Sequence, residues 1–118
     1  METTALQSLF GSRAAESLLL HLFHYGETYG RAVSRDFTIS LDSVQRHLDR
    51  FEGAGVLVCK RQGRTLVYTW NPKSRLAARL RDLVAVVHDG MSVDAKQRLF
   101  TQRRQPRSKD KPVIRGGR

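Results

Sequence analysis

The sequence predicts a mainly α-helical domain with one small β-hairpin, an α+β fold. Apolar residues recur every three or four positions in residues 13–24 and 73–88, which is the period of an amphipathic helix. Residues 56–60 and 65–70 instead carry the β-branched and aromatic side chains that are typical of strands. The 118 residues are enough for one domain with a modest core.

The first third of the chain predicts short helices. One is expected at Leu6–Phe10, and a longer one over residues 13–24 has Ser12 as its N-cap and Gly26 as its stop. A weaker helix is expected over residues 28–37. Its inward-facing side chains are expected to be Ala32, Val33 and Phe37.

A firmer helix is predicted to begin at Ser40. Ser40 is a suitable N-cap, and Asp42 is well placed against the positive end of the helix dipole. Gly53 and Gly55 are expected to end this helix. Its apolar stripe is predicted to consist of Val44, Leu48 and Phe51.

The second half of the chain predicts the hairpin and two more helices. Residues 61–64 separate the two strands and place a glycine where a hairpin turn needs one. Asn71-Pro72 closes the hairpin, a long helix follows over residues 73–88, and a short one is expected over 92–100. We expect a folded domain over residues 1–90, and a short helix with a flexible basic tail over 91–118.

The charge of the chain is strongly positive and is concentrated towards its end. The formal net charge is +10, and residues 101–118 hold seven basic groups and one acidic group among prolines and glycines. Such a stretch buries too little apolar surface to offset its ordering entropy, so we expect it to stay flexible and to add affinity without specificity. A chain this basic is expected to bind a polyanion.

Other features predict a cytoplasmic, nucleoid-associated protein without a membrane partner. No apolar run approaches the roughly 18 residues of a membrane helix, and the first residues lack the basic flank of a signal peptide. The single cysteine, Cys59, excludes an internal disulfide and fits a reducing compartment. We expect Cys59 to be a small core residue rather than a redox sensor.

Two of the short helices, joined by the turn at residues 38–40, form a helix-turn-helix, and the hairpin follows directly as a wing. Residues 9–72 resemble the winged helix-turn-helix of prokaryotic transcriptional regulators, especially the ArsR-like and MarR-like groups. The resemblance rests on Ile39–Leu48 and Phe51–Leu57, which are similar to the family pattern S-x-x-x-V-x-x-H-L followed by L-E-x-A-G-L. The sequence departs from the pattern at Ser34 and Thr38, where the family tends to have Ala and Gly.

This resemblance implies binding to double-stranded DNA. In such a motif the second helix lies in the major groove, where Arg46 can bind guanine with two donors. Asp42 would repel a phosphate, so capping is its expected role. The wing cations are expected to contact phosphates or the minor groove, although they could simply protect an edge strand. The candidate DNA-binding residues are Ser40, Ser43, Gln45, Arg46, Arg50, Lys60, Arg61 and Arg64.

The resemblance also implies a homodimer, because such regulators pair through their terminal helices. The helix over residues 73–88 has an apolar stripe with no obvious partner in so small a core. The alternative is that this stripe packs on its own domain. The expected dimer contacts are Leu76, Leu80, Leu83 and Val87.

We expect no metal, no cofactor and no catalysis. His21 and His24 have a spacing that a metal can use, but no cysteine pair or second histidine cluster is nearby in the sequence. Asp82, His88 and Asp89 lack the paired-histidine spacing of some ArsR-like sensors. Residues 9–14 resemble the opening of small nucleotidyltransferases, but the aspartate pair that those enzymes need does not follow.

Three hypotheses follow from the sequence. The first is a dimeric, sequence-specific transcriptional regulator, expected to be a repressor. The second is a winged-helix module for protein interaction. The third is a non-specific nucleic-acid binder driven by charge. The operator, the regulated genes and any effector stay open.

Overall fold

The computed structural model describes residues 5–100, so the basic tail predicted over residues 101–118 lies outside the described residues. The described chain forms six helices and one antiparallel hairpin. In chain order the elements are α1 (Ala5–Phe10), α2 (Arg13–Tyr25), α3 (Gly30–Phe37), α4 (Leu41–Gly53), β1 (Leu57–Gln62), β2 (Thr65–Trp70), α5 (Arg75–Asp89) and α6 (Val93–Phe100).

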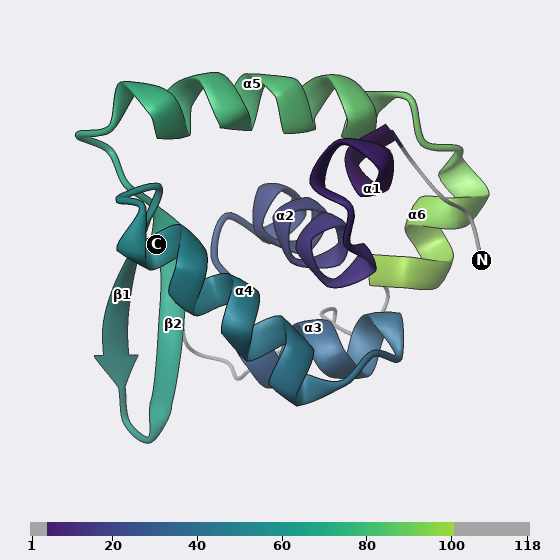
Figure 1. Cartoon of the computed structure of the whole chain (residues 1–118). Coiled ribbons are helices and arrows are strands. Elements are labelled where there is room, and N and C mark those ends of the chain that lie inside the picture. Colours follow the sequence, from purple (N-terminus) through teal and green to yellow (C-terminus); the bar gives the residue numbers. More distant parts are fainter. Residues whose placement is uncertain (1–4, 101–118) are drawn as a thin grey trace.

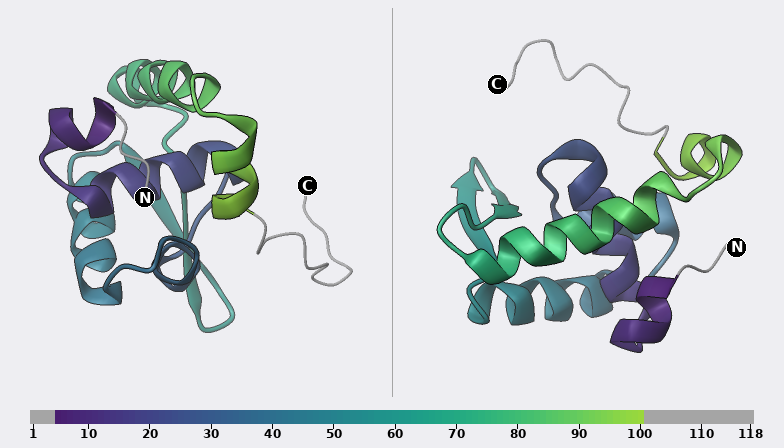
Figure 2. Two further views of the ribbon diagram at one scale, coloured as in Figure 1. Left: turned by 90° about the vertical axis from the view of Figure 1, so that its right-hand side faces the viewer. Right: turned by 90° about the horizontal axis from the view of Figure 1, so that it is seen from above.

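Helix α2 is the centre of the fold. Helix α5 lies along one side of α2, α3 and α4 lie on the other, and the hairpin closes one end (Figure 1). The two further views agree on this order (Figure 2). The core between these helices is formed by fully buried side chains. Its members include Leu18, Leu19, Leu22, Val33, Val44, Leu48 and Val84.

The predicted caps of α2 and the predicted N-cap of α4 are confirmed by their hydrogen bonds and backbone angles. The Ser12 hydroxyl accepts from the Ala15 N–H at 3.1 Å, and the Ser40 hydroxyl accepts from the Ser43 N–H at 3.2 Å. Gly26 ends α2 with φ 84°, a left-handed conformation that glycine adopts without a steric penalty. These caps satisfy backbone groups that a helix leaves unpaired at its ends.

The turn between α3 and α4 has a left-handed backbone conformation at Thr38, a position at which the regulators that the sequence resembles tend to have glycine. Thr38 adopts φ 55°, the only positive φ of a non-glycine residue in the described part of the chain. The neighbouring Ser34 accepts from the Ile39 N–H through its backbone carbonyl at 3.1 Å. Its hydroxyl also donates to the Ile39 carbonyl at 2.6 Å. These two bonds hold the turn closed despite the strained conformation of Thr38.

The hairpin follows α4 directly, which completes a winged-helix fold. Its register pairs Leu57 with Trp70 and Gln62 with Thr65, so that Gly63 and Arg64 form a two-residue turn. Gly63 takes φ 63°, as the first position of such a turn requires.

The predicted start of α3 at residue 28 is wrong. Helix α3 begins at Gly30, because Thr28 pairs with Tyr68 in an antiparallel bridge. The Thr28 N–H donates to the Tyr68 carbonyl at 3.0 Å, and the Tyr68 N–H donates back at 2.8 Å. This bridge joins the segment before α3 to the inner strand of the wing.

The apolar stripe of α5 is divided between the core and the surface. Leu80 and Val87 pack against the core, together with the buried Val84. Leu76 and Leu83 face outward and are 62% and 39% exposed. Met91, Ala95 and Phe100, in and just before α6, belong to the same core. Within residues 5–100, each helix is too short or too polar to cross a bilayer.

Candidate nucleic-acid interface

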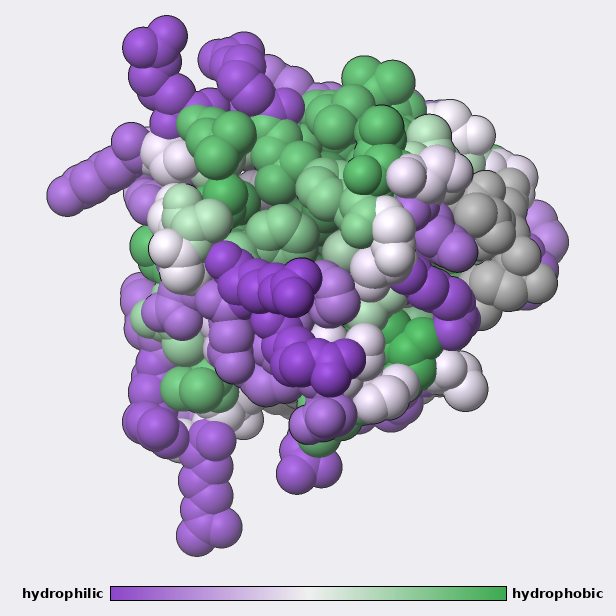
Figure 3. Space-filling model, viewed as in Figure 1, coloured by the Kyte–Doolittle hydropathy of each residue, from purple (hydrophilic) through white to green (hydrophobic). Residues whose placement is uncertain are grey.

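The cationic candidates gather on α4 and the hairpin. Arg46 and Arg50 are exposed on α4, and Lys60, Arg61 and Arg64 are exposed on the hairpin. The amino end of α4 and the turn of the hairpin both lie on the side of the molecule away from α5 (Figure 1). The surface over α4 and the hairpin is largely hydrophilic, as Figure 3 shows. We refer to the exposed cations of α4 and the hairpin, two elements that are in contact, as the charged face.

The two serine candidates lie at the amino end of α4, and Ser40 is committed to local structure. The Ser40 hydroxyl is exposed but caps the helix through its bond to the Ser43 N–H. Ser43 is half-buried, and its carbonyl accepts from the Nδ1–H of His47 at 2.9 Å. Asp42 lies in the first turn of α4, where its charge complements the helix dipole as predicted.

Gln45 is bound inside the fold rather than free on the surface. Its Nε2 donates to the Tyr68 hydroxyl at 2.9 Å and to the Asp49 carboxylate at 3.1 Å. Both amide hydrogens are thereby used within the chain. This arrangement was not predicted, because it depends on where the hairpin meets α4.

A groove of about 220 Å³ is lined by residues from the start of α3, from α4 and from the wing. Two cationic side chains line it, Arg31 of α3 and Arg64 of the hairpin turn. The amino end of α3 has neither a side-chain cap nor an acidic residue in its first turn, so its peptide N–H groups favour an anion. The remaining lining residues are Tyr29, Gly30, Leu41, Gln45, Thr65 and Leu66.

Sequence reasoning missed Arg31. It is 15 positions from Arg46 in the chain and joins the charged face only through the packing of α3 against α4. The one local signal is the acid-free first turn of α3. A groove lined by two guanidinium groups and the positive end of a helix can hold a phosphate.

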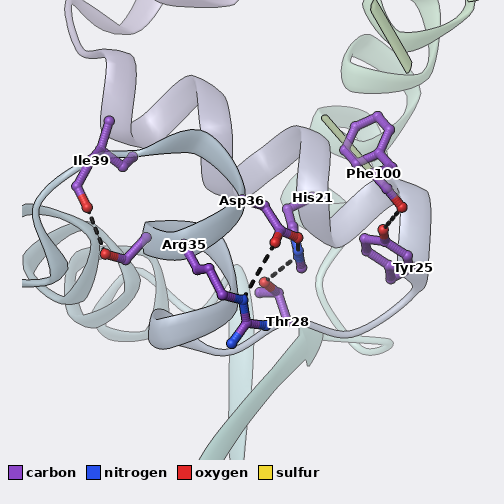
Figure 4. A network of polar contacts seen from close by, with 8 residues as sticks. His21, Tyr25, Thr28, Arg35, Asp36, Ile39 and Phe100 are labelled. Carbon is purple, nitrogen blue, oxygen red and sulfur yellow. Dashed lines mark hydrogen bonds and ion pairs between the residues drawn. The ribbon is translucent and has the colours of Figure 1, made fainter. Parts of the chain in front are cut away.

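His21, the first of the two histidines whose spacing a metal could use, is a buried structural group. Its Nε2 lies 3.0 Å from the Asp36 carboxylate, and its Nδ1 lies 2.8 Å from the Thr28 hydroxyl. Figure 4 shows this network at the junction of α2 and α3, together with the contact between Tyr25 and Phe100. The side chains of His21 and Asp36 are both 0% exposed. The pair ties α2 to α3 and to the segment before it.

The second histidine, His24, meets His88 of α5 instead of His21. Among residues 5–100, no group of three His, Cys, Asp or Glu side chains is arranged to hold a metal ion. Cys59 is half-buried on β1 and packs against the core, as predicted.

No protein-family model and no curated protein sequence matches this chain. The chain is similar in structure to reduced AbfR bound to DNA, with a TM-score of 0.52 and 19% sequence identity over 84% of this chain and 73% of that one. Overoxidized AbfR bound to DNA gives a TM-score of 0.49 at 19% identity, over 84% of this chain and 74% of that one. The first likeness agrees with the winged-helix fold that the sequence predicted.

Proposed function

We propose that this chain is a sequence-specific transcriptional regulator that binds double-stranded DNA as a homodimer and represses transcription. The observation that carries the proposal is the charged face of α4 and the hairpin on a winged-helix fold. AbfR, which has a similar fold, has been captured bound to DNA. We extend DNA binding to this chain because its own α4 and hairpin carry exposed cationic side chains.

In the proposed complex α4 lies in the major groove. Arg46, exposed near the amino end of α4, is assigned to a base edge, and two guanidinium donors suit guanine. Arg50 and the wing cations Lys60 and Arg61 are assigned to phosphates. The groove between Arg31 and Arg64 is assigned to one phosphate of the backbone beside the wing. Ser40, whose hydroxyl can still donate while it caps the helix, and Ser43 are assigned as further hydrogen-bonding groups at the amino end of α4.

The proposed dimer forms through α5 and α1. Apolar side chains remain exposed on both helices. A hydrophobic area runs over the upper part of the molecule near these helices in Figure 3. Exposed apolar area of this kind marks association surfaces in soluble proteins. The exposed side chains are Leu9, Phe10, Leu76, Leu83 and Val86.

The experiment that tests the function is selection of bound sequences from random duplexes with the full chain. Enrichment of one palindromic sequence, bound at least about 1,000 times more tightly than random duplex, is the expected result for a specific regulator. Equal affinity for all duplexes with a steep salt dependence identifies a non-specific binder instead. Absence of duplex binding identifies a protein-interaction module. A reporter gene placed behind the selected sequence then measures repression.

A further inference from the structure

Gln45 of α4 is the polar side chain that links this helix to the wing, through a hydrogen bond to Tyr68 of β2. The Gln45 Nε2 lies 2.9 Å from the Tyr68 hydroxyl and 3.1 Å from Asp49 Oδ1. On the opposite side of the amide, Oε1 lies 2.9 Å from the position that a Cβ at Gly30 would occupy. The amide therefore lies where α3, α4 and the wing meet.

We propose that Tyr68 is a positioning residue that fixes Gln45 and thereby sets the orientation of α4 relative to the wing, on which discrimination between DNA sequences depends. The inference rests on the proposed function. Under this proposal Gln45 does not contact a base. It affects DNA binding by holding α4 in position. Direct adenine recognition by glutamine needs both the amide N–H and the carbonyl, and the Gln45 N–H groups are already used.

Tyr68 is suited to this role because both its side chain and its backbone are held in place. Its side chain is 1% exposed and belongs to the core cluster. Its backbone exchanges two hydrogen bonds with Thr28, and the Thr28 hydroxyl contacts the buried His21. The backbone of Tyr68 is therefore tied to the segment before α3 and its ring is fixed in the core, so movement of α4 away from the wing would break the bond between the Tyr68 hydroxyl and Gln45.

The Tyr68 hydroxyl keeps its proton at the pH of a cell, so its hydrogen bond to Gln45 does not change with pH there. Burial raises the pKa of the Tyr68 hydroxyl to about 12, so the group stays neutral at the pH of a cell. A neutral hydroxyl can accept from Gln45 and still carry its own proton. The contact is thus independent of pH in the range in which DNA binding is measured.

The test substitutes Tyr68→Phe, which removes one hydroxyl and keeps the ring in the core. We expect the affinity ratio between the selected duplex and random duplex to fall by about 2- to 12-fold, the effect of one neutral hydrogen bond. The slope of log affinity against log salt should stay unchanged, because no phosphate contact is lost. The matched control is Tyr25→Phe, which removes a hydroxyl that donates to the Phe100 carbonyl far from α4. It should leave the ratio unchanged.

Gly30→Ala provides a second variant that approaches Gln45 from the other side. The new Cβ would lie 2.9 Å from Gln45 Oε1 and 3.1 Å from Leu41 Cδ1, so both side chains must shift, and Gly30 has no positive φ that would strain an alanine. The affinity ratio between the selected duplex and random duplex should fall in Gly30→Ala too. A Gln45→Ala variant that loses discrimination while Tyr68→Phe and Gly30→Ala keep it would overturn the proposal, because Gln45 would then read a base directly.

A measurement without DNA separates this inference from the proposed function. The side-chain NH₂ resonances of Gln45 should shift and exchange faster with solvent in Tyr68→Phe, but not in Tyr25→Phe. A wild-type chain that prefers no duplex overturns the proposed function, and with it the role of Tyr68 in discrimination. Unchanged Gln45 resonances in Tyr68→Phe overturn the positioning contact itself, whatever the chain binds.

Discussion

His24 of α2 and His88 of α5 hydrogen-bond each other, with 3.0 Å between Nδ1 of His24 and Nε2 of His88. The ring of Phe100 stacks on His24 at a centroid distance of 4.0 Å, so the pair also holds α6. One ring must donate and the other accept, so at least one of them is neutral. The contact joins the central helix to the helix that carries the proposed dimer surface.

This pair predicts a loss of stability in mild acid. Burial, and then the neighbouring His88, lowers the pKa of His24 to about 4 from its ordinary value of 6.5. Burial lowers the pKa of His88 as well, and the nearby Lys96 acts in the same direction while Asp89 opposes it. Because the unfolded chain takes up these protons first, the free energy of unfolding should fall as the pH drops from about 6.5 to about 4.

Urea denaturation across this pH range measures the effect. In the variant His88→Gln the free energy of unfolding should depend less on pH than it does in the wild type. The control His47→Gln changes a histidine on α4 that bonds only within its own helix in the described structure. An equal dependence on pH in wild type and His88→Gln would contradict the prediction.

Asp36 should contribute far more to stability than an exposed aspartate. The variant Asp36→Ala leaves the buried His21 without its carboxylate, and loss of one partner from a buried pair costs about 3–5 kcal/mol. The matched control Asp82→Ala removes an exposed pair with Arg79, worth about 0–1 kcal/mol. Equilibrium denaturation of both variants measures the difference, and similar losses would contradict it.

Arg46 and Arg64 should affect DNA binding in different ways. Loss of a bidentate base contact in Arg46→Ala should reduce discrimination by about 1–3 kcal/mol. Loss of a phosphate contact in Arg64→Ala should weaken all duplexes alike and reduce the salt slope by about one unit. Titrations of the selected and random duplexes at several salt concentrations separate the two effects. The reverse pattern would mean that α4 is oriented differently in the groove.

The proposed dimer surface on α5 can be tested with two equally exposed valines. Val86 on α5 is 70% exposed and Val93 on α6 is 71% exposed, so neither substitution disturbs the core. The variant Val86→Asp places a charge in the proposed interface and should yield monomers in analytical ultracentrifugation, whereas Val93→Asp should remain dimeric. A dimeric Val86→Asp protein would place the interface elsewhere. Leu80 is unsuitable for this test because it packs against the core.

The local elements and their order follow from short stretches of sequence. The Ser12 and Ser40 caps, the stop at Gly26 and the hairpin turn at Gly63 are all predicted by the sequence and present in the structure. Each depends on interactions within about one helical turn or one tight turn of the chain, and such interactions are encoded in neighbouring residues. The resulting order of helices and hairpin was enough to predict the winged-helix fold.

Which polar and apolar side chains meet depends on the packing of distant elements. The fold made these choices. It gave His24 a partner 64 positions away and drew Gln45 to Tyr68. It also turned Leu80 inward while Leu76, on the same predicted stripe, stayed exposed. Helical periodicity gives the spacing of a face but not the angle at which two elements cross. That angle is set by the packing of the whole core, and it determines which side chains are covered, paired or left free for a partner.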